Sequence, residues 1–294
     1  MCEHKSVLLK EVLDMLSPMD GGVYFDGTFG GGGYTKAILG SADCRVIACD
    51  RDDRVIKIAD DFKKKYGDRF QFFHDKFSNI KSIMREDCDG VVLDLGVSNF
   101  QLADPERGFS FKSSGPVDMS MGLCNETAMD VIHRYSEKDL ADIIYKFGEE
   151  HFSRKIAKHI KLNLKKINNT EDLANVIRNC IGRRGKIDPA TKTFQALRIF
   201  VNKELEELEK VLSDSIPLLK PNGKILVVSF HSLEDRIVKL FFKGLSYPKD
   251  SPFILLNKKP ITSSEEEFIL NPKSRSAKLR CLQYQRDADV IATS

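Results

Sequence analysis

The fold of this chain is decided by one glycine-rich stretch, Asp26-Gly27-Thr28-Phe29-Gly30-Gly31-Gly32-Gly33-Tyr34. It follows the short apolar run 23–26, which predicts a strand, and it leads into a helical pattern. Such a turn is a general nucleotide-binding device, because glycines let the backbone approach a ligand and the helix N-terminus offers N–H donors. A tight turn without a ligand is the alternative. Four consecutive glycines disfavour it, because each of them costs backbone entropy.

Short apolar runs alternate with helical patterns along much of the chain, which is typical of βα units around a parallel sheet. We predict strands at 23–26, 45–50, 70–74, 90–94, 224–230 and 277–284. Three of the first four end in an acid, at Asp26, Asp50 and Asp94. Because the carboxyl ends of the strands form the ligand crevice of an open α/β sheet, we expect these carboxylates to converge there.

The segment between the fourth and fifth strands has a different pattern. Residues 104–186 predict a loop and then helices at 128–135, 137–147, 152–164 and 172–180, without a buried strand. A helix at 193–212 follows, and an acidic, proline-containing stretch that looks mobile precedes the last strand. We therefore predict a discontinuous, doubly wound α/β domain formed by 1–103 and 187–294, interrupted by an all-helical insert at 104–186.

The strand-end acids indicate which ligand the crevice binds. Asp50 is placed to accept both hydroxyls of an adenosine ribose. NAD-dependent dehydrogenases have an acid at the same place, so Asp50 does not distinguish NAD from another cofactor that contains adenosine. Asp26 would repel a pyrophosphate but suits the amino group of a methionine moiety. The loop also lacks the lysine of a nucleoside triphosphate site. These features favour S-adenosyl-L-methionine over NAD. The alternative is a purely structural role, in which Asp26 or Asp94 caps a helix N-terminus.

Composition restricts the class of protein. Hydrophobic residues make up 41% and charged residues 30%, which is ordinary for a soluble globular chain. No apolar stretch approaches the roughly 20 residues that span a bilayer, and no signal or transit segment is visible, so we expect a cytoplasmic protein without membrane contact. The seven cysteines lack a Cys-x-x-Cys pair, which disfavours disulfides and structural zinc. A net charge of +3 leaves a nucleic-acid partner open.

Two neighbouring blocks make the sequence recognisable: Asp94-Leu95-Gly96-Val97-Ser98-Asn99-Phe100-Gln101-Leu102 and Glu106-Arg107-Gly108-Phe109-Ser110-Phe111. With further blocks at 4–12, 26–34, 148–154, 189–199, 229–236 and 271–280, the chain resembles the bacterial 16S rRNA (cytosine-N4)-methyltransferases, the RsmH/MraW family. The resemblance implies a class I S-adenosylmethionine-dependent methyltransferase fold whose helical insert recognises the substrate. It also implies N4-methylation of a single cytidine in the decoding region (P site) of 16S rRNA, within the 30S subunit. The donor-binding positions it implies are Gly32, Gly33, Tyr34, Asp50, Phe77, Asp94 and Gln101, to which the charge argument adds Asp26.

Methyl transfer to an exocyclic amine depends mainly on alignment, because the sulfonium is already a good leaving group. Asp94 is the candidate acceptor near the reacting N4–H. His231, in the loop after the strand at 224–230, is the candidate proton acceptor, with a structural role as its alternative. We expect no metal in this step.

The target base must be single-stranded or flipped out of the folded RNA to reach the methyl group. Phe109 and Phe111 are candidates for stacking on it, with packing inside the insert as the alternative. Basic clusters at 154–166, 183–186 and 273–280 suit phosphate contacts. Arg184, Lys273 and Arg275 are the candidate residues within them.

Four positions depart from the commoner family pattern. Tyr34 stands where many relatives have a histidine, and Gly31 stands where arginine or alanine is usual, changes that backbone contacts to the donor should survive. Ser120 stands where relatives have an arginine, and Gly122 stands where they have an acidic or polar residue. The departures at Ser120 and Gly122 keep a second interpretation open, an RNA-binding ribosome-assembly factor with weak or lost turnover. The sequence also leaves open whether the protein is a monomer or a homodimer.

Overall fold

The protein is described here from a computed structural model, which describes residues 6–182, 185, 187–247 and 249–285. The chain divides into two compact units. The first, which we call the sheet unit, comprises residues 1–96 and 205–294, and the second, the helical unit, comprises residues 97–204. The insert expected at 104–186 lies within the helical unit, which extends beyond it on both sides.

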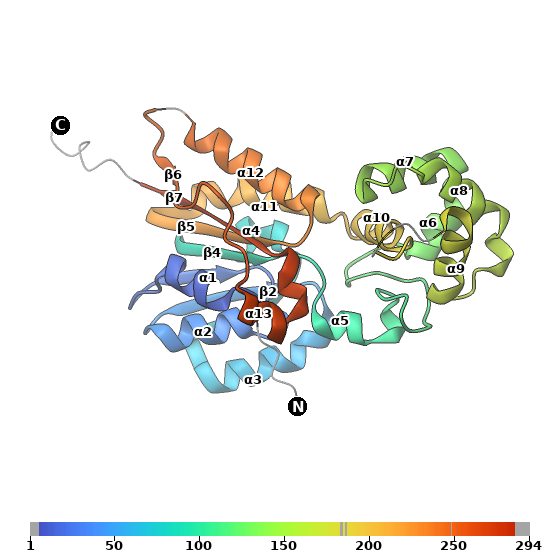
Figure 1. The fold of residues 1–294 in the computed structure, drawn as a ribbon. Coiled ribbons are helices and arrows are strands. Elements are labelled where there is room, and N and C mark those ends of the chain that lie inside the picture. Colours follow the sequence, from blue (N-terminus) through green and yellow to red (C-terminus); the bar gives the residue numbers. More distant parts are fainter. Residues whose placement is uncertain (1–5, 183–184, 186, 248, 286–294) are drawn as a thin grey trace. The chain divides into compact units, whose positions relative to one another are not determined.

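The sheet unit is built on seven strands in the order β3-β2-β1-β4-β5-β7-β6 (Figure 1). Strands β1 to β5 pair in parallel, whereas β7 is antiparallel to both β5 and β6. The strands are β1 (Val23–Asp26), β2 (Arg45–Asp50), β3 (Phe70–His74), β4 (Cys88–Asp94), β5 (Leu219–Ser229), β6 (Phe253–Leu255) and β7 (Lys278–Tyr284). The strand order reverses between β1 and β4, and this switch point is where α/β sheets bind ligands. The predicted class I methyltransferase fold is confirmed, as a mixed sheet with one reversed strand.

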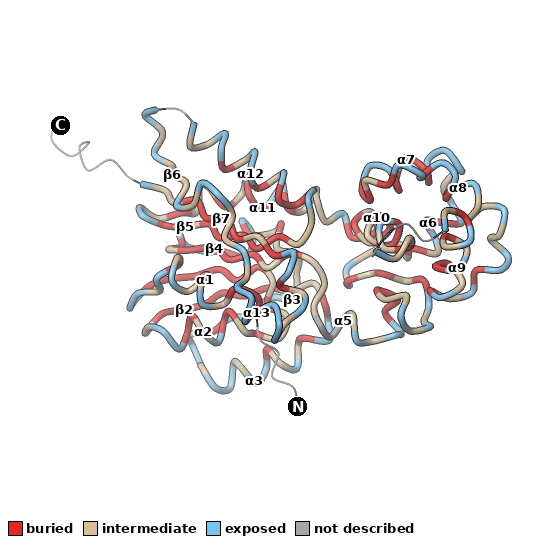
Figure 2. The backbone as a smooth tube through the Cα atoms, in the orientation of Figure 1, coloured by how far each residue is buried: buried red, intermediate tan, exposed pale blue. Residues whose placement is uncertain are grey.

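Each face of the sheet carries its own apolar core, because successive side chains of a strand point to opposite faces. Tyr24 and Val46 pack on the face that also buries Val12 and Ile38. The opposite core contains Phe25 and Phe242. Figure 2 shows buried residues running along the strands, with exposed residues on the outer sides of the helices. The helices of this unit are α1 (Leu9–Leu16), α2 (Gly33–Ser41), α3 (Ile56–Tyr66), α4 (Ile80–Ile83), α11 (Glu204–Ser215, in this unit from Leu205), α12 (Ser232–Ser246) and α13 (Glu265–Leu270).

The helical unit has its own buried interior, formed by residues such as Ile132, Leu140 and Ile156. No strand occurs among its described residues. Side-chain N-caps begin three of its helices: Thr127 accepts from Asp130, Ser136 from Asp139 and Asn169 from Asp172. The helices are α5 (Asn99–Ala103), α6 (Ala128–Arg134), α7 (Glu137–Gly148), α8 (Ser153–Leu162), α9 (Thr170–Ile181) and α10 (Thr191–Asn202). None of the helices in the described ranges is long and apolar enough to cross a membrane.

The structure corrects two predictions. The single helix predicted at 193–212 is in fact α10 followed by α11, because Lys203 adopts a left-handed backbone (φ 52°) that ends the helical hydrogen-bond ladder. Phe200, in the last turn of α10, packs against Phe147 and Tyr135 of the helical unit, with ring centroids 5.8 and 5.3 Å apart. The acidic, proline-containing stretch before the last strand, for which no element was predicted, contains β6 and α13. Ser264 caps α13 by accepting the N–H of Glu267.

Candidate functional site

The glycine-rich loop between β1 and α2 is held in one conformation by hydrogen bonds to neighbouring strands. The N–H of Gly27 donates to the carbonyl of Val92, and that of Phe29 donates to the carbonyl of Cys49. The N–H of Gly30 donates to Oδ2 of Asp50, at 2.7 Å. The loop is thus tied to both strands that flank β1 before any ligand binds.

Two of the glycines predicted to bind the donor are required by conformation or packing. Gly32 has φ +74° at the N-cap of α2, and a Cβ there would lie 2.4 Å from the ring of Phe62. A Cβ on Gly33 would lie 1.9 Å from Oγ of Ser6. Neither position has room for a side chain, so the backbone at the start of α2 stays bare for a close ligand.

Asp50 ends β2 and bridges two backbone segments. Its Oδ2 accepts from Gly30 and its Oδ1 accepts from the N–H of Asp52, at 2.9 Å. Burial raises the pKa of this carboxyl above its ordinary value, and the two backbone hydrogen bonds oppose that shift. A carboxylate oxygen has two acceptor directions, so these bonds leave capacity for the predicted ribose hydroxyls.

Asp26 is completely buried at the end of β1. Its Oδ1 accepts the N–H of Thr28 at 3.1 Å, and its Oδ2 accepts the hydroxyl of Thr35 at 2.7 Å. Burial raises its pKa to about 6. With both oxygens engaged, Asp26 anchors the loop to α2, which is the kind of structural role that the sequence left open for it.

Asp94 ends β4, and Thr28 connects it to Asp26. The N–H of Asp94 donates to Oγ1 of Thr28 at 2.7 Å, while the N–H of Thr28 donates to Asp26. Oδ1 of Asp94 is buried and has no hydrogen-bond partner among the described residues. Burial raises the pKa of this carboxyl well above its ordinary value, the charges of Asp26 and Glu234 raise it further, and Lys273 lowers it. The predicted convergence of strand-end acids therefore occurs, and Thr28 is the residue that sequence reasoning missed.

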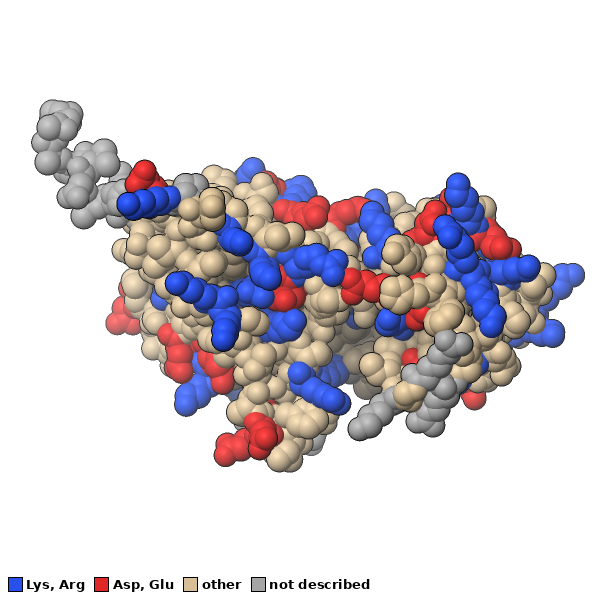
Figure 3. All heavy atoms as spheres, turned by 45° about the horizontal axis from the view of Figure 1, so that its top comes forward, with Lys and Arg blue, Asp and Glu red and all other residues tan. Residues whose placement is uncertain are grey.

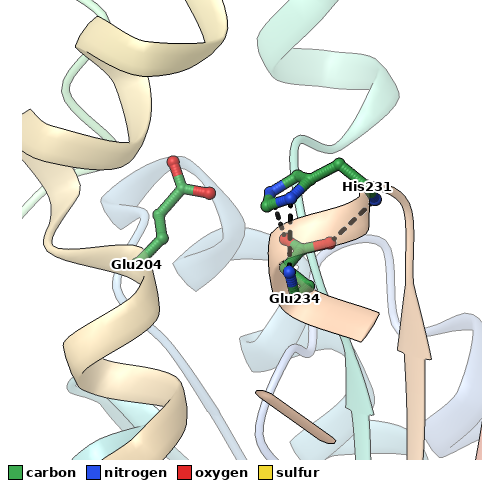
Figure 4. Close-up of side chains that lie close together, drawn as sticks. All are labelled: Glu204, His231 and Glu234. Carbon is green, nitrogen blue, oxygen red and sulfur yellow. Dashed lines mark hydrogen bonds and ion pairs between the residues drawn. The ribbon is translucent and has the colours of Figure 1, made fainter. Parts of the chain in front are cut away.

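His231 follows β5 and forms the N-cap of α12 (Figure 4). Its Nδ1 accepts the N–H of Glu234 at 3.3 Å, and Oε2 of Glu234 accepts the N–H groups of Phe230 and His231 in return. Nε2 lies 3.1 Å from Oε1 of Glu234 but has no aligned hydrogen-bond partner among the described residues. Figure 4 also draws Glu204, which ends the helical unit and whose carboxylate is bound at 2.8 Å through both oxygens by Arg198.

The other predicted donor-site residues differ in their surroundings. Phe77 is half-buried. It lies beside the loop, because a Cβ built on Gly27 would be 3.0 Å from the Cβ of Phe77. Tyr34 is buried, and its hydroxyl donates to the carbonyl of Val7, so this residue offers a ligand only its backbone. Gln101 belongs to the helical unit, where its Oε1 accepts the N–H of Ser98 at 2.9 Å.

Both rings proposed to stack on a base are packed inside the helical unit. Phe109 is buried, with the Arg107 guanidinium 5.7 Å from its ring centroid. Phe111 packs edge-on against Phe194 at 4.9 Å, and Arg178 lies over its ring. Their stacking on a base remains a prediction.

The candidate phosphate contacts are dissimilar. Arg184 lies outside the described residues. Arg275 is exposed, with its guanidinium 5.9 Å from the ring of Phe268. The ammonium of Lys273 is buried and has no hydrogen-bond partner among the described residues. Of the three, Arg275 is the described cation that a phosphate can reach directly.

The segment with the family departures is supported from within the helical unit. Asn202 accepts the N–H of Met121 at 2.8 Å and donates to the carbonyl of Met119 at 2.7 Å. Arg107 donates to the carbonyl of Ser120 at 3.0 Å. Gly122 has φ +91°, a conformation that disfavours any side chain. Glycine at this position therefore suits the backbone conformation of the segment.

The residues at the carboxyl ends of β1, β2 and β4 fit S-adenosylmethionine better than a dinucleotide. Asp26, Asp50 and Asp94 place three carboxyl groups around the loop, which suit a ligand with a sulfonium and an ammonium group better than a pyrophosphate. The unpartnered Oδ1 of Asp94 gives such an ammonium an acceptor. The glycine loop provides the close backbone approach that an adenosine needs.

Comparison with known proteins gives a consistent result over the whole chain. A model of the MraW methylase family matches residues 1–285. A ribosomal RNA small subunit methyltransferase H from Wolbachia sp. subsp. Drosophila simulans (strain wRi) is 52% identical, covering 95% of this chain and 98% of that protein. One from Ehrlichia canis (strain Jake) is 49% identical, covering 95% and 99%. Among solved structures, an rRNA methylase from Streptococcus thermophilus aligns over 94% of this chain and 95% of its own, with 10% identity and a TM-score of 0.45. That similarity is too distant to inform the fold, which the strand order establishes.

Proposed function

The chain belongs to the MraW methylase family, and on this premise we propose that it methylates the exocyclic N4 of cytidine 1402, in the decoding region (P site) of 16S rRNA in the small ribosomal subunit. The relatives carry the proposal. They are about half identical over nearly their full length, and their names describe methyltransferases of small-subunit ribosomal RNA. Such a substrate would place the protein in the cytoplasm and give it the 30S subunit as its partner.

The cofactor is S-adenosylmethionine. When bound, it supplies an electrophilic methyl group on a sulfonium. In the proposed arrangement Asp50 accepts the ribose hydroxyls, Phe77 lies beside the adenine, and the backbone of Gly32 and Gly33 approaches the donor. Asp94 stands at the methionine end, where its charge also favours the positive charge that N4 gains on attack.

His231 is the proposed proton acceptor for the methylated amine. It lies in the same unit as Asp94, after the neighbouring strand of the sheet, and its Nε2 is buried without an aligned partner. Because the N4 lone pair is delocalised into the ring, the base must be held in line with the methyl group. Alignment then supplies much of the rate enhancement. A transfer without a metal remains a prediction.

The helical unit is the proposed RNA-recognition domain. Exposed cations lie on α8 and on the turn after it. They are Arg154, Lys155 and Lys158 on the helix, and Lys165 and Lys166 on the turn. Figure 3 shows exposed Lys and Arg side chains on this unit, as it also does on the sheet unit. Their positive charge suits phosphate contacts that position the RNA without reading its sequence.

The proposal is tested by incubating the protein with labelled S-adenosylmethionine and 30S subunits that lack the modification, followed by nucleoside mass spectrometry. We expect N4-methylcytidine with the wild-type protein and none with Asp94→Asn. Naked 16S rRNA is tested as a second substrate in parallel. Binding to the 30S subunit without label would favour the assembly factor with lost turnover. Label on a different nucleoside would replace the proposed acceptor.

A further inference from the structure

Unpartnered polar atoms mark a binding site in the sheet unit. Among the described residues, Asp94 Oδ1, Lys273 Nζ, Ser274 Oγ and His231 Nε2 of this unit are buried without a hydrogen-bond partner. Folded proteins rarely leave such atoms unpaired, because each unpaired group pays its full desolvation cost. Two of these groups, Asp94 and Lys273, carry opposite charges and interact electrostatically. The pair is therefore a candidate for a ligand with both a donor and an acceptor.

Lys273 is held by an ordered turn. It lies in the short helical turn Pro272–Ser276, between α13 and β7. The N–H of Ser274 donates to the carbonyl of Asn271, and the hydroxyl of Ser263 donates to the carbonyl of Ser274, both at 2.9 Å. Burial lowers the pKa of Lys273 to about 8, against the opposing effect of Asp94. A buried cation costs free energy unless it gains a partner, so an anionic ligand at Lys273 would offset this cost.

Within the described part of the chain, two cations near Lys273 in the sequence have carboxylate partners, whereas Lys273 does not. Lys278 and Arg280 both pair with Asp235, at 3.2 and 2.7 Å. These residues stabilise the contact between β7 and α12. Lys273 has no such partner among the described residues, although it lies in the same part of the chain. Its ammonium therefore forms with the described residues no ion pair of the kind that Lys278 and Arg280 form with Asp235.

We propose that Lys273 binds the α-carboxylate of the methionine moiety of S-adenosylmethionine, while Asp94 accepts a hydrogen bond from its α-ammonium. An amino-acid zwitterion presents one charge of each sign, which matches this pair. An RNA phosphate is a poorer match, because it would have to reach a buried ammonium that interacts with the carboxylate of Asp94. This assignment replaces the phosphate contact predicted for Lys273 from the sequence.

The test measures ligand binding to the full chain by calorimetry without RNA. The ligands are S-adenosylmethionine, its decarboxylated form, which keeps the ammonium, and methylthioadenosine, which lacks the amino-acid moiety. We expect wild type to lose about 10- to 100-fold in affinity when the carboxylate is removed, as for a charge-assisted hydrogen bond. In Lys273→Met that loss should fall below about threefold, while methylthioadenosine binding stays unchanged.

Lys259→Met is the matched control, because Lys259 is an exposed lysine of the same C-terminal region. It should retain the wild-type ratio between the two donor forms. The proposal is overturned if Lys273→Met keeps that ratio, or if it weakens methylthioadenosine equally, as general misfolding would. If the variant does not fold, wild type decides alone: equal affinity for both donor forms rejects the proposal. Since no RNA is present, failure here is distinguishable from failure to methylate rRNA.

Discussion

The carboxylate of Asp50 accepts the backbone N–H of Gly30 at 2.7 Å, so the acid that ends β2 fixes the loop that follows β1. The same carboxylate accepts the N–H of Asp52. One side chain thus shapes the glycine loop and offers the remaining acceptor directions to a ribose. Loop conformation and donor binding are coupled through this residue.

Asp50→Asn should weaken binding of S-adenosylhomocysteine by about 10- to 100-fold, because an amide keeps only one acceptor oxygen for the N–H groups of Gly30 and Asp52 and the ribose. Calorimetry measures the affinity, and thermal unfolding checks that the fold is retained. Asp53→Asn is the control, since Asp53 is an exposed acid nearby. Equal affinities for wild type and Asp50→Asn would argue against a donor contact at Asp50.

Gly32→Ala should destabilise the protein by about 2 kcal/mol and reduce donor affinity. The added Cβ would have to occupy a left-handed conformation and displace the Phe62 ring. Chemical denaturation gives the free energy of unfolding. Gly40→Ala, in the same helix, meets nothing within 4 Å and should be neutral or stabilise slightly. If both variants lost stability alike, packing at Gly32 would not be the cause.

Asp26 should make stability depend on pH. Its pKa is raised by burial from 3.8 to about 6. Between these values the folded state keeps a proton that the unfolded state has released, so this group lowers the free energy of unfolding as pH rises. Asp26→Asn removes that contribution. Its stability relative to wild type should therefore increase from pH 4 to pH 7, by at most about 3 kcal/mol. A difference that stays constant over this range in urea titrations would refute the effect.

Two substitutions of His231 should show whether this residue only caps α12 or also takes part in the reaction. Asn is a good N-cap, so His231→Asn should preserve α12, whereas His231→Ala removes the side chain that accepts from Glu234. If His231 accepts a proton, both variants should lower kcat by about 100-fold and leave donor affinity unchanged. Recovery of wild-type kcat in His231→Asn would assign His231 to helix capping alone.

Much of the fold follows from local sequence. Strands β1, β2 and β3 lie at the predicted residues, because each is a short run rich in apolar residues that ends in a polar one. The break between α10 and α11 was not predictable, because Lys203 interrupts an otherwise continuous helical pattern. Strand β6 has only three residues, Phe253–Leu255, and depends on pairing with β7 for its existence.

The site was predictable to a similar extent. Asp26, Asp50 and Asp94 end parallel strands, so their approach follows from the sheet itself. The orientation of Tyr34 toward Val7, away from a ligand, required the packing of α2 against the N-terminal segment.

The sequence by itself determined the βα pattern, the glycine loop and the acids around it, because these depend on residue type and on spacing within one strand or turn. Only the tertiary structure decided which charges are satisfied. Thr28 joins Asp26 to Asp94. The ammonium of Lys273 is buried, interacts electrostatically with Asp94 and has no hydrogen-bond partner among the described residues. Contacts between residues so far apart in the chain depend on how the strands and turns pack, and their energies depend on the burial that this packing creates.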